Sequence, residues 1–159
     1  MGDTRRFDLF GVYIMRHATT TTRIADIAGG KGILQANLRQ HGFLRVETFD
    51  KRSKHKRGGG MNYKHRLFTP QLAQGFQLLV GMHPDEATDV IIVSAIKNHI
   101  PFIVCPCCIK PTLTVYRGKR YYEGWVNHLE NVATSGGYSI TRTHLKMQGN
   151  NIVIHGRPK

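Results

Sequence analysis

The chain has 159 residues, the size of one domain, and it is 40% hydrophobic and 21% charged, as folded proteins commonly are. Twenty-three Lys and Arg residues against ten Asp and Glu residues give a net charge of +13. A charge of that size attracts polyanions, so we expect a nucleic-acid partner, RNA before DNA. No apolar run is long enough to span a membrane, and no basic amphipathic helix indicates a membrane surface.

The N-terminus and the cysteines indicate the compartment. Asp3 and Asp8 lie where a signal peptide would have its apolar core. All three cysteines fall within residues 105–108, which is not the pattern of a disulfide framework. We therefore expect a cytoplasmic protein in a reducing environment, with a reducing organelle left open.

The first half of the chain is predicted to open with a helix over residues 5–17 and a threonine linker, which together make residues 1–22 an N-terminal segment. A basic, glycine-rich loop over residues 51–63 divides the elements that follow. Those elements are a strand at 23–27, a helix at 33–40, strands at 44–50, 64–68 and 76–82, and a helical turn at 69–74 with Thr69 as its cap.

The second half alternates in the same way and ends in a hairpin. Its predicted elements are a helix at 84–99, a strand at 101–109, a basic loop at 110–120, a helix at 121–134 and paired strands at 138–147 and 150–156. Strands separated by helices favour an α/β fold. We predict a single domain, residues 1–159, with a Rossmann-like, seven-stranded, mostly parallel sheet, helices on both faces and a C-terminal antiparallel hairpin.

Ligands of such sheets bind beyond the carboxyl ends of the strands. We expect these ends to converge on one crevice, formed by residues 26–32, 50, 81–85 and 106–108.

The stretch IADIAGGKGIL, residues 24–34, predicts close contact between backbone and ligand. It is not a Walker A loop, because Gly32 follows Lys31 where a hydroxyl residue is required. It is not a classical dinucleotide fingerprint either, because Gln35 stands at the third glycine. A glycine turn without a ligand is the structural alternative.

A ligand with a ribose and an ammonium group fits this stretch better. Asp26 can accept from an ammonium, while Gly29, Gly30 and Gly32 let the chain pass beneath the ligand. Asp50 ends the next strand, where a carboxylate suits two ribose hydroxyls. These features together indicate S-adenosylmethionine (SAM).

The string IADIAGGKGIL followed by VETFD resembles motif I and the ribose acid of class I SAM-dependent methyltransferases. Ala28 replaces the first glycine of that motif, so a Cβ must be accommodated beside the methionine end. The resemblance implies a cofactor site formed by Asp26, Ala28, Gly29, Gly30, Gly32, Asp50, Lys51 and His83.

Two further strings, GMHPDEATDVIIVSAI and PFIVCPCCI, resemble a branch of this family with Pro-Cys-Cys after the fifth strand. That branch includes tRNA 2′-O-methyltransferases. The chain lacks the Asn-Pro-Pro-Tyr string used to methylate exocyclic amines, so methylation of a base nitrogen by that route is disfavoured.

His83, Asp85 and Cys107 are the candidate catalytic residues. His83 could orient or deprotonate a hydroxyl, and Asp85 could fix its tautomer or act itself. Alternatively, residues 84–86 simply begin a helix. For the cysteines, packing is favoured over a nucleophile, and no metal is expected because no second cysteine pair follows.

Two basic clusters flank the predicted crevice and are expected to bind RNA phosphates. Tyr63 could stack on a base, and the second cluster is interleaved with Tyr116, Tyr121, Tyr122 and Trp125. The basic residues are Lys51, Arg52, Lys54, Lys56, Arg57, Lys64 and Arg66 in the first cluster and Lys110, Arg117, Lys119 and Arg120 in the second.

The sequence thus predicts a SAM-dependent methyltransferase that acts on RNA, tRNA or rRNA, by direct methyl transfer. A non-catalytic RNA-binding or ribosome-associated protein with the same fold is the alternative, and a small-molecule methyltransferase is the second. So small a chain is expected to use a protein partner or to self-associate.

Overall fold

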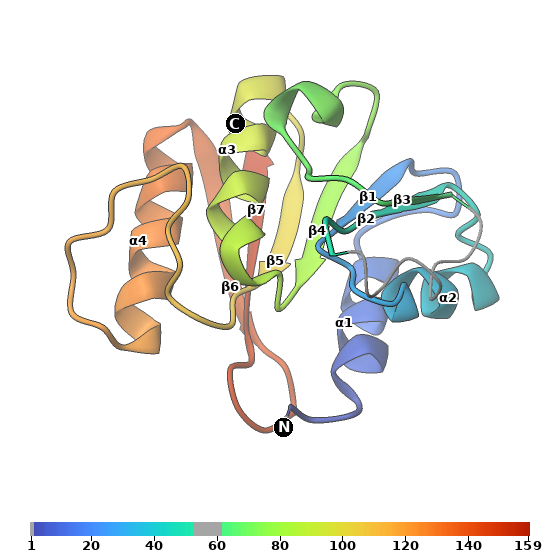
Figure 1. The fold of residues 1–159 in the computed structure, drawn as a ribbon, viewed down its shortest axis with the longest axis horizontal. Coiled ribbons are helices and arrows are strands. Elements are labelled where there is room, and N and C mark those ends of the chain that lie inside the picture. Colours follow the sequence, from blue (N-terminus) through green and yellow to red (C-terminus); the bar gives the residue numbers. More distant parts are fainter. Residues whose placement is uncertain (1, 53–61) are drawn as a thin grey trace.

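The computed structural model describes residues 2–52 and 62–159, so Lys54, Lys56 and Arg57 of the first basic cluster lie outside it. Seven strands form one sheet in the order β3-β2-β1-β4-β5-β7-β6 (Figure 1). The strands are β1 Ile24–Ile27, β2 Val46–Phe49, β3 Tyr63–Lys64, β4 Leu78–Met82, β5 Phe102–Cys105, β6 Tyr138–His144 and β7 Ile152–Pro158.

The sheet is parallel except at β7. Strands β1, β2, β3, β4 and β5 pair in parallel, whereas β7 lies antiparallel between β5 and β6. The hairpin register places Tyr138 opposite Pro158 and His144 opposite Ile152. The predicted sheet and its C-terminal antiparallel pair are confirmed.

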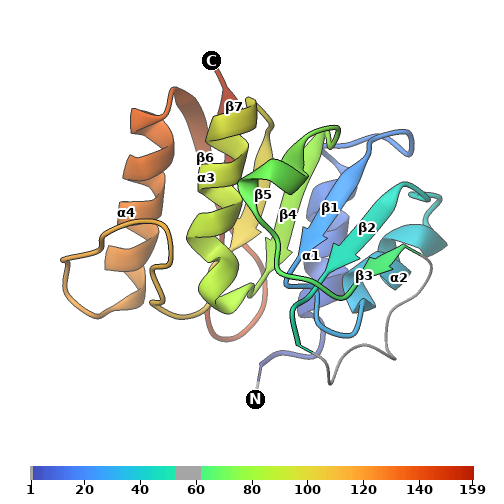
Figure 2. The same ribbon diagram turned by 45° about the horizontal axis from the view of Figure 1, so that its top comes forward.

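Helices cover both faces of the sheet. The helices are α1 Arg6–Met15, α2 Ile33–Gln40, α3 Thr88–Asn98 and α4 Tyr122–Ser135, with 3₁₀ turns at Pro70–Ala73 and Asp85–Ala87. Helices α3 and α4 pack on one face around Trp125 and Phe102, and α1 and α2 pack on the other around Phe10 and Leu34 (Figure 2). The apolar residues of these helices therefore pack on the sheet and form a core layer on each of its faces. No helix among the described residues is long and apolar enough to cross a membrane.

Several predicted boundaries were wrong for local reasons. The helix predicted over 84–99 begins with a 3₁₀ turn, because Asp85 has a left-handed backbone with φ 57°. The strand predicted over 101–109 ends at Cys105, before Pro106. The strand predicted over 64–68 is only Tyr63–Lys64, and the Thr69 side chain makes no capping hydrogen bond.

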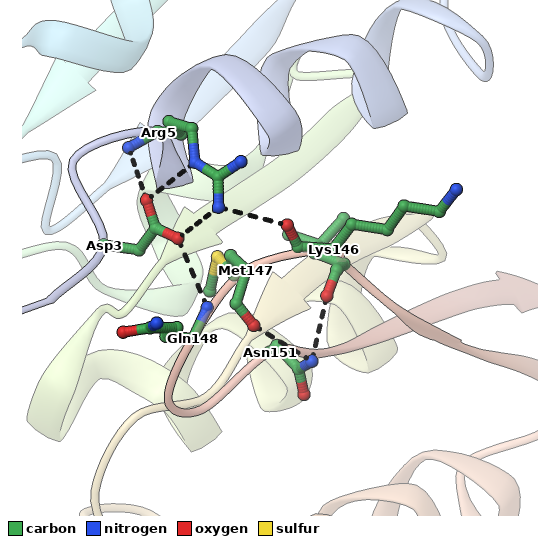
Figure 3. Close-up of polar contacts among 7 residues, drawn as sticks. Asp3, Arg5, Lys146, Met147, Gln148 and Asn151 are labelled. Atoms are coloured by element: carbon green, nitrogen blue, oxygen red, sulfur yellow. Dashed lines mark hydrogen bonds and ion pairs between the residues drawn. The ribbon is translucent and has the colours of Figure 1, made fainter.

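The N-terminal segment is tied to the loop between β6 and β7 (Figure 3). Asp3 accepts hydrogen bonds from the Arg5 backbone and side chain and from the Gln148 amide. The Arg5 guanidinium also reaches the Lys146 carbonyl at 3.5 Å. Asn151 donates to the carbonyl groups of Leu145 and Met147, so the loop is held from both sides.

A buried histidine on β7 makes stability depend on pH. His155 is 3% exposed and lies against Tyr13, His17 and Arg157. Burial and the charges of Arg157 and His17 lower the pKa of His155 from 6.5 to about 4. Between these values the unfolded chain binds a proton that the folded chain does not, so stability rises with pH.

Acidification from pH 7 to pH 5 is therefore expected to cost about 2 kcal/mol of unfolding free energy through His155. The contribution of Asp26 to the unfolding free energy changes in the opposite direction, since burial raises the pKa of Asp26 to about 7. The His155 contribution is isolated by urea unfolding of the wild type and of His155→Gln at both pH values. The variant should lose about 2 kcal/mol less than the wild type, and an equal loss would contradict the assignment.

Candidate functional site

A pocket of about 220 Å³ opens at the carboxyl ends of β1, β2 and β4. Three of the four predicted strand ends meet there, whereas residues 106–108 do not line its wall. The apolar part of the wall is formed by Ile27, Ala28, Phe49, Leu67, Phe68, Pro84, Ala87 and Val90. The polar part is formed by Asp50, Lys51, Arg52, Arg66, His83, Asp85, Glu86 and Thr112.

The glycine loop after β1 is tightly packed against two polar side chains. A Cβ at Gly29 would lie 2.3 Å from the Asp26 carboxylate and 2.6 Å from the Thr48 methyl group. Ala28 has φ 55°, a left-handed conformation that costs a residue with a Cβ about 1 kcal/mol. The loop therefore keeps the backbone course of a glycine motif although Ala28 replaces its first glycine.

Asp26 lies beneath this loop and not on the pocket wall. It is 1% exposed and accepts a hydrogen bond from the Thr48 hydroxyl at 3.1 Å. Burial raises the pKa of Asp26 to about 7, against the effect of the Thr48 hydrogen bond. A cation near the loop would favour the ionised carboxylate.

Asp50 lies on the pocket wall, and Arg52 holds its carboxylate. The guanidinium donates from Nε to Oδ1 at 3.0 Å and from Nη2 to Oδ2 at 2.8 Å. The backbone amides of Gly30 and Arg52 donate to the same carboxylate. Burial acts to raise the pKa of Asp50, but these hydrogen bonds bring it below its usual value.

His83 lines the pocket, and one hydrogen bond determines which of its ring nitrogens carries the proton. Its Nε2 lies 2.7 Å from the Asn150 carbonyl oxygen, which can only accept, so Nε2 carries the proton. Burial lowers the pKa of His83, and within residues 2–52 and 62–159 no group donates a hydrogen bond to Nδ1 of the neutral ring, which can therefore accept one. The backbone at His83 is left-handed, with φ 50°.

Asn150 connects the hairpin loop to this corner of the pocket. Its carbonyl accepts from His83 and, at 3.6 Å, from the Cys105 thiol, while its side-chain amide donates to the Cys107 carbonyl. Asn150, and not Asp85, thus sets the His83 tautomer. The sequence predicts Asn150 only as the first residue of the last hairpin strand, and nothing in it links positions 83 and 150.

Asp85 makes its contacts with the Pro-Cys-Cys segment. Its Oδ1 accepts from the Cys108 thiol at 2.6 Å and pairs with the Lys110 ammonium at 2.7 Å. Cys107 lies next to Cys108, with their sulfur atoms 3.5 Å apart, and does not line the pocket. The geometry therefore does not support Cys107 as a nucleophile facing the acceptor.

Several residues of the two basic clusters are paired within the chain. Lys51 pairs with Glu86, Arg52 with Asp50 and Lys110 with Asp85. Trp125 is fully buried and stacks on His128, so it is not available to a base. Tyr63 donates its hydroxyl to the Gly30 carbonyl at 2.7 Å. Across residues 2–52 and 62–159, five predicted RNA-binding residues are exposed and without an ion pair, namely Lys64, Arg66, Arg117, Lys119 and Arg120.

A buried acid on α3 organises the second basic loop. Asp89 is 0% exposed, and its Oδ2 accepts from the backbone amides of Thr112, Leu113 and Thr114 at 2.8–2.9 Å. The Thr114 hydroxyl adds a fourth hydrogen bond at 3.0 Å. Nothing in the sequence indicates this role, since Asp89 is one of several acids in the first half of the predicted helix 84–99.

Asp89→Ala is therefore expected to lower the unfolding free energy by about 3 kcal/mol, because several hydrogen bonds to one charged acceptor are lost together. Asp89→Asn keeps one acceptor oxygen and should lose less. Urea unfolding of both variants measures the difference. A loss below about 1 kcal/mol for Asp89→Ala would show that water replaces the carboxylate.

The strand order with one antiparallel strand next to the edge, and the glycine loop after β1, define the fold of class I SAM-dependent methyltransferases. Solved structures confirm the fold. A SAM-dependent methyltransferase from Aquifex aeolicus matches 97% of this chain and 93% of its own at a TM-score of 0.60 and 8% identity. The ribosomal protein L11 methylase from Lactobacillus delbrueckii subsp. bulgaricus matches 100% of this chain and 81% of its own, with a TM-score of 0.65 and 18% identity.

A fibrillarin/Nop5p complex structure matches 97% of this chain and 83% of its own, with a TM-score of 0.65 and 13% identity. The sequence itself matches no protein-family model and no curated protein. The structural comparisons therefore establish the fold alone.

Proposed function

We propose that this protein is a SAM-dependent methyltransferase that acts on RNA. The observation that carries the proposal is the joint position of three strand ends around one pocket. The glycine loop follows β1, a carboxylate ends β2, and a histidine with a free Nδ1 follows β4. SAM, when bound, supplies a methyl group on a positively charged sulfur.

The residues present fit that cofactor. Asp26 beneath the loop has a pKa of about 7, so an ammonium group nearby would ionise it and gain a counter-charge, and the loop has no room for a side chain at Gly29. Phe49 and Phe68 on the pocket wall suit an adenine ring. Asp50 ends β2 with a carboxylate that suits two ribose hydroxyls, once the guanidinium of Arg52 is displaced.

Arg52 therefore competes with the cofactor for Asp50. Arg52→Gln removes two charge-assisted hydrogen bonds from the unliganded protein and is expected to tighten SAM binding about three- to tenfold. Calorimetric titration with SAM measures the change. Lys97→Gln, which removes an exposed cation from the last turn of α3, is the charge-matched control, and equal or weaker binding by Arg52→Gln would contradict the competition.

For the methyl acceptor we propose a ribose hydroxyl of RNA. His83 Nδ1 can accept the hydroxyl proton while Nε2 remains bonded to Asn150, so a nucleophilic oxygen forms without a rearrangement of the ring. The Pro-Cys-Cys resemblance points to the same reaction. The names of two structural neighbours, a ribosomal protein methylase and fibrillarin, refer to those proteins and are compatible with a ribosomal or RNA setting.

The RNA surface is proposed to include the unpaired residues of the second basic loop. The triple variant Arg117→Ala, Lys119→Ala, Arg120→Ala should bind total tRNA at least about tenfold more weakly and with a shallower salt dependence. The control is Arg16→Ala, Lys97→Ala, Lys159→Ala, which makes the same charge change near the other ends of the strands. If both triple variants lost the same tRNA affinity, RNA binding would depend on net charge alone and not on this loop.

The alternative function, an RNA-binding protein without catalysis, makes a distinct prediction. It requires salt-dependent RNA binding without SAM binding. A small-molecule methyltransferase requires SAM binding, and the triple variant at Arg117, Lys119 and Arg120 should then lose no more tRNA affinity than its control. Fluorescence anisotropy with labelled tRNA and calorimetry with SAM, on the same sample, separate the three functions.

A further inference from the structure

One cluster of potential metal ligands lies beside the pocket, within the described residues. The ligand atoms of Asp85, Cys107 and Cys108 all lie within 4.8 Å of one another. Asp85 follows β4, and the two cysteines follow β5, its parallel neighbour. The fold thus brings together three groups that are 22 and 23 residues apart in sequence.

We propose that Asp85, Cys107 and Cys108 form a binding site for a thiophilic divalent cation of the zinc type. Two thiolates and one carboxylate are a ligand set that zinc accepts, with its fourth position open. This inference is independent of the proposed methyltransferase function.

The sulfur atoms are already close to the separation that a metal requires. Two sulfur ligands of a tetrahedral zinc ion, each about 2.3 Å from the metal, are about 3.7 Å apart. The sulfur atoms of Cys107 and Cys108 are 3.5 Å apart. Both cysteines are half-buried and are not in a disulfide, so an ion can reach them without unfolding of the core.

The carboxylate keeps one oxygen available. Both contacts of Asp85 described here, with Cys108 and with Lys110, use Oδ1. Oδ2 takes part in no hydrogen bond within the described part of the chain and can ligate while Lys110 stays on Oδ1. Metal binding displaces the thiol protons of Cys107 and Cys108 to solvent. Loss of the Cys108 proton ends its hydrogen bond to Asp85 and lets these two atoms separate.

The charges of the site balance with the ion in place. Two thiolates and one carboxylate carry three negative charges, which a divalent cation and the Lys110 ammonium offset together. Charge balance matters because these groups are partly withdrawn from water. Lys110 is 51% exposed, so it can also move away from the ion without unpacking the loop.

Cobalt(II) is the probe, because thiolate ligation gives it intense near-ultraviolet charge-transfer absorption. Metal-free protein titrated with cobalt should develop this band at one ion per chain, and zinc should abolish it. Cys107→Ser and Cys108→Ser should each reduce the band and weaken binding, and the double variant should lose the band completely. Asp85→Asn should keep the band at lower cobalt affinity.

Cys105→Ser is the matched control, because Cys105 is buried and directed to the Asn150 carbonyl. It should retain the whole band. Absence of the band in the wild type, its persistence in the double variant, or saturation at half an ion per chain would each overturn the single-chain site. SAM binding is measured separately on the same metal-free protein, so failure of one proposal leaves the other intact.

Discussion

Asp50→Ala is expected to weaken SAM binding about 100-fold. A carboxylate at the end of β2 can accept from both ribose hydroxyls, and hydrogen bonds to a charged acceptor contribute about 1.5–3 kcal/mol each. Part of that gain is offset in the wild type, because the hydroxyls must displace the Arg52 guanidinium. Calorimetric titration gives the ratio of dissociation constants directly.

The variant must be shown to fold, since Asp50 also accepts from the Gly30 amide. Circular dichroism and a thermal melt provide that check. Glu123→Ala removes an exposed acid from α4 and should leave SAM binding unchanged. A loss of less than about threefold in Asp50→Ala would remove Asp50 from the cofactor site.

His83→Asn is expected to lower the rate of methyl transfer by about 100- to 1,000-fold, the usual contribution of a general base. Asparagine tolerates the left-handed backbone at this position, where φ is 50°, so the turn should persist. The dissociation constant for SAM should change far less than the rate. The assay follows tritium from labelled SAM into total RNA.

His99→Asn is the matched control, because His99 is also left-handed, with φ 53°, and caps the far end of α3. It should transfer methyl groups at the wild-type rate. If His83→Asn retained full activity, acceptor positioning alone would account for transfer and His83 would have no role in proton removal.

The sequence predicted the fold well because its signals are local. Apolar periodicity located every major strand and helix, and the alternation of the two established the parallel sheet. Boundaries were wrong where a single backbone conformation decided them, as at Asp85, whose left-handed φ delays helix α3. No residue pattern encodes that conformation, since aspartate adopts it only occasionally.

The site was predicted less completely because its contacts are long-range. Asp50 and His83 were placed on the pocket wall by motif and strand-end reasoning, and the structure puts them there. Arg52 is only two residues from Asp50, but the sequence shows it as one basic residue among several. Its hydrogen bonds to Asp50, which a bound cofactor must displace, are seen only in the structure. Asn150 and Asp89 act through partners many residues away, so only the fold reveals them.

The cysteines show the same limit. From sequence, Cys105, Cys107 and Cys108 lack a second cysteine pair and do not suggest a metal. The fold supplies the missing ligand from the neighbouring strand, as Asp85. Sequence motifs for metal sites use the spacing of residues within one segment, so they do not detect ligands that follow two different strands.

Calorimetric titration of the metal-free wild-type protein with SAM tests whether the pocket at the ends of β1, β2 and β4 is a cofactor site. We expect one site per chain, with release of protons near pH 7 because the cofactor's ammonium ionises Asp26, whose pKa is about 7 in the free protein. Titration in two buffers of different ionisation enthalpy measures that release. No heat of binding at millimolar SAM would contradict the assignment of this pocket as a cofactor site.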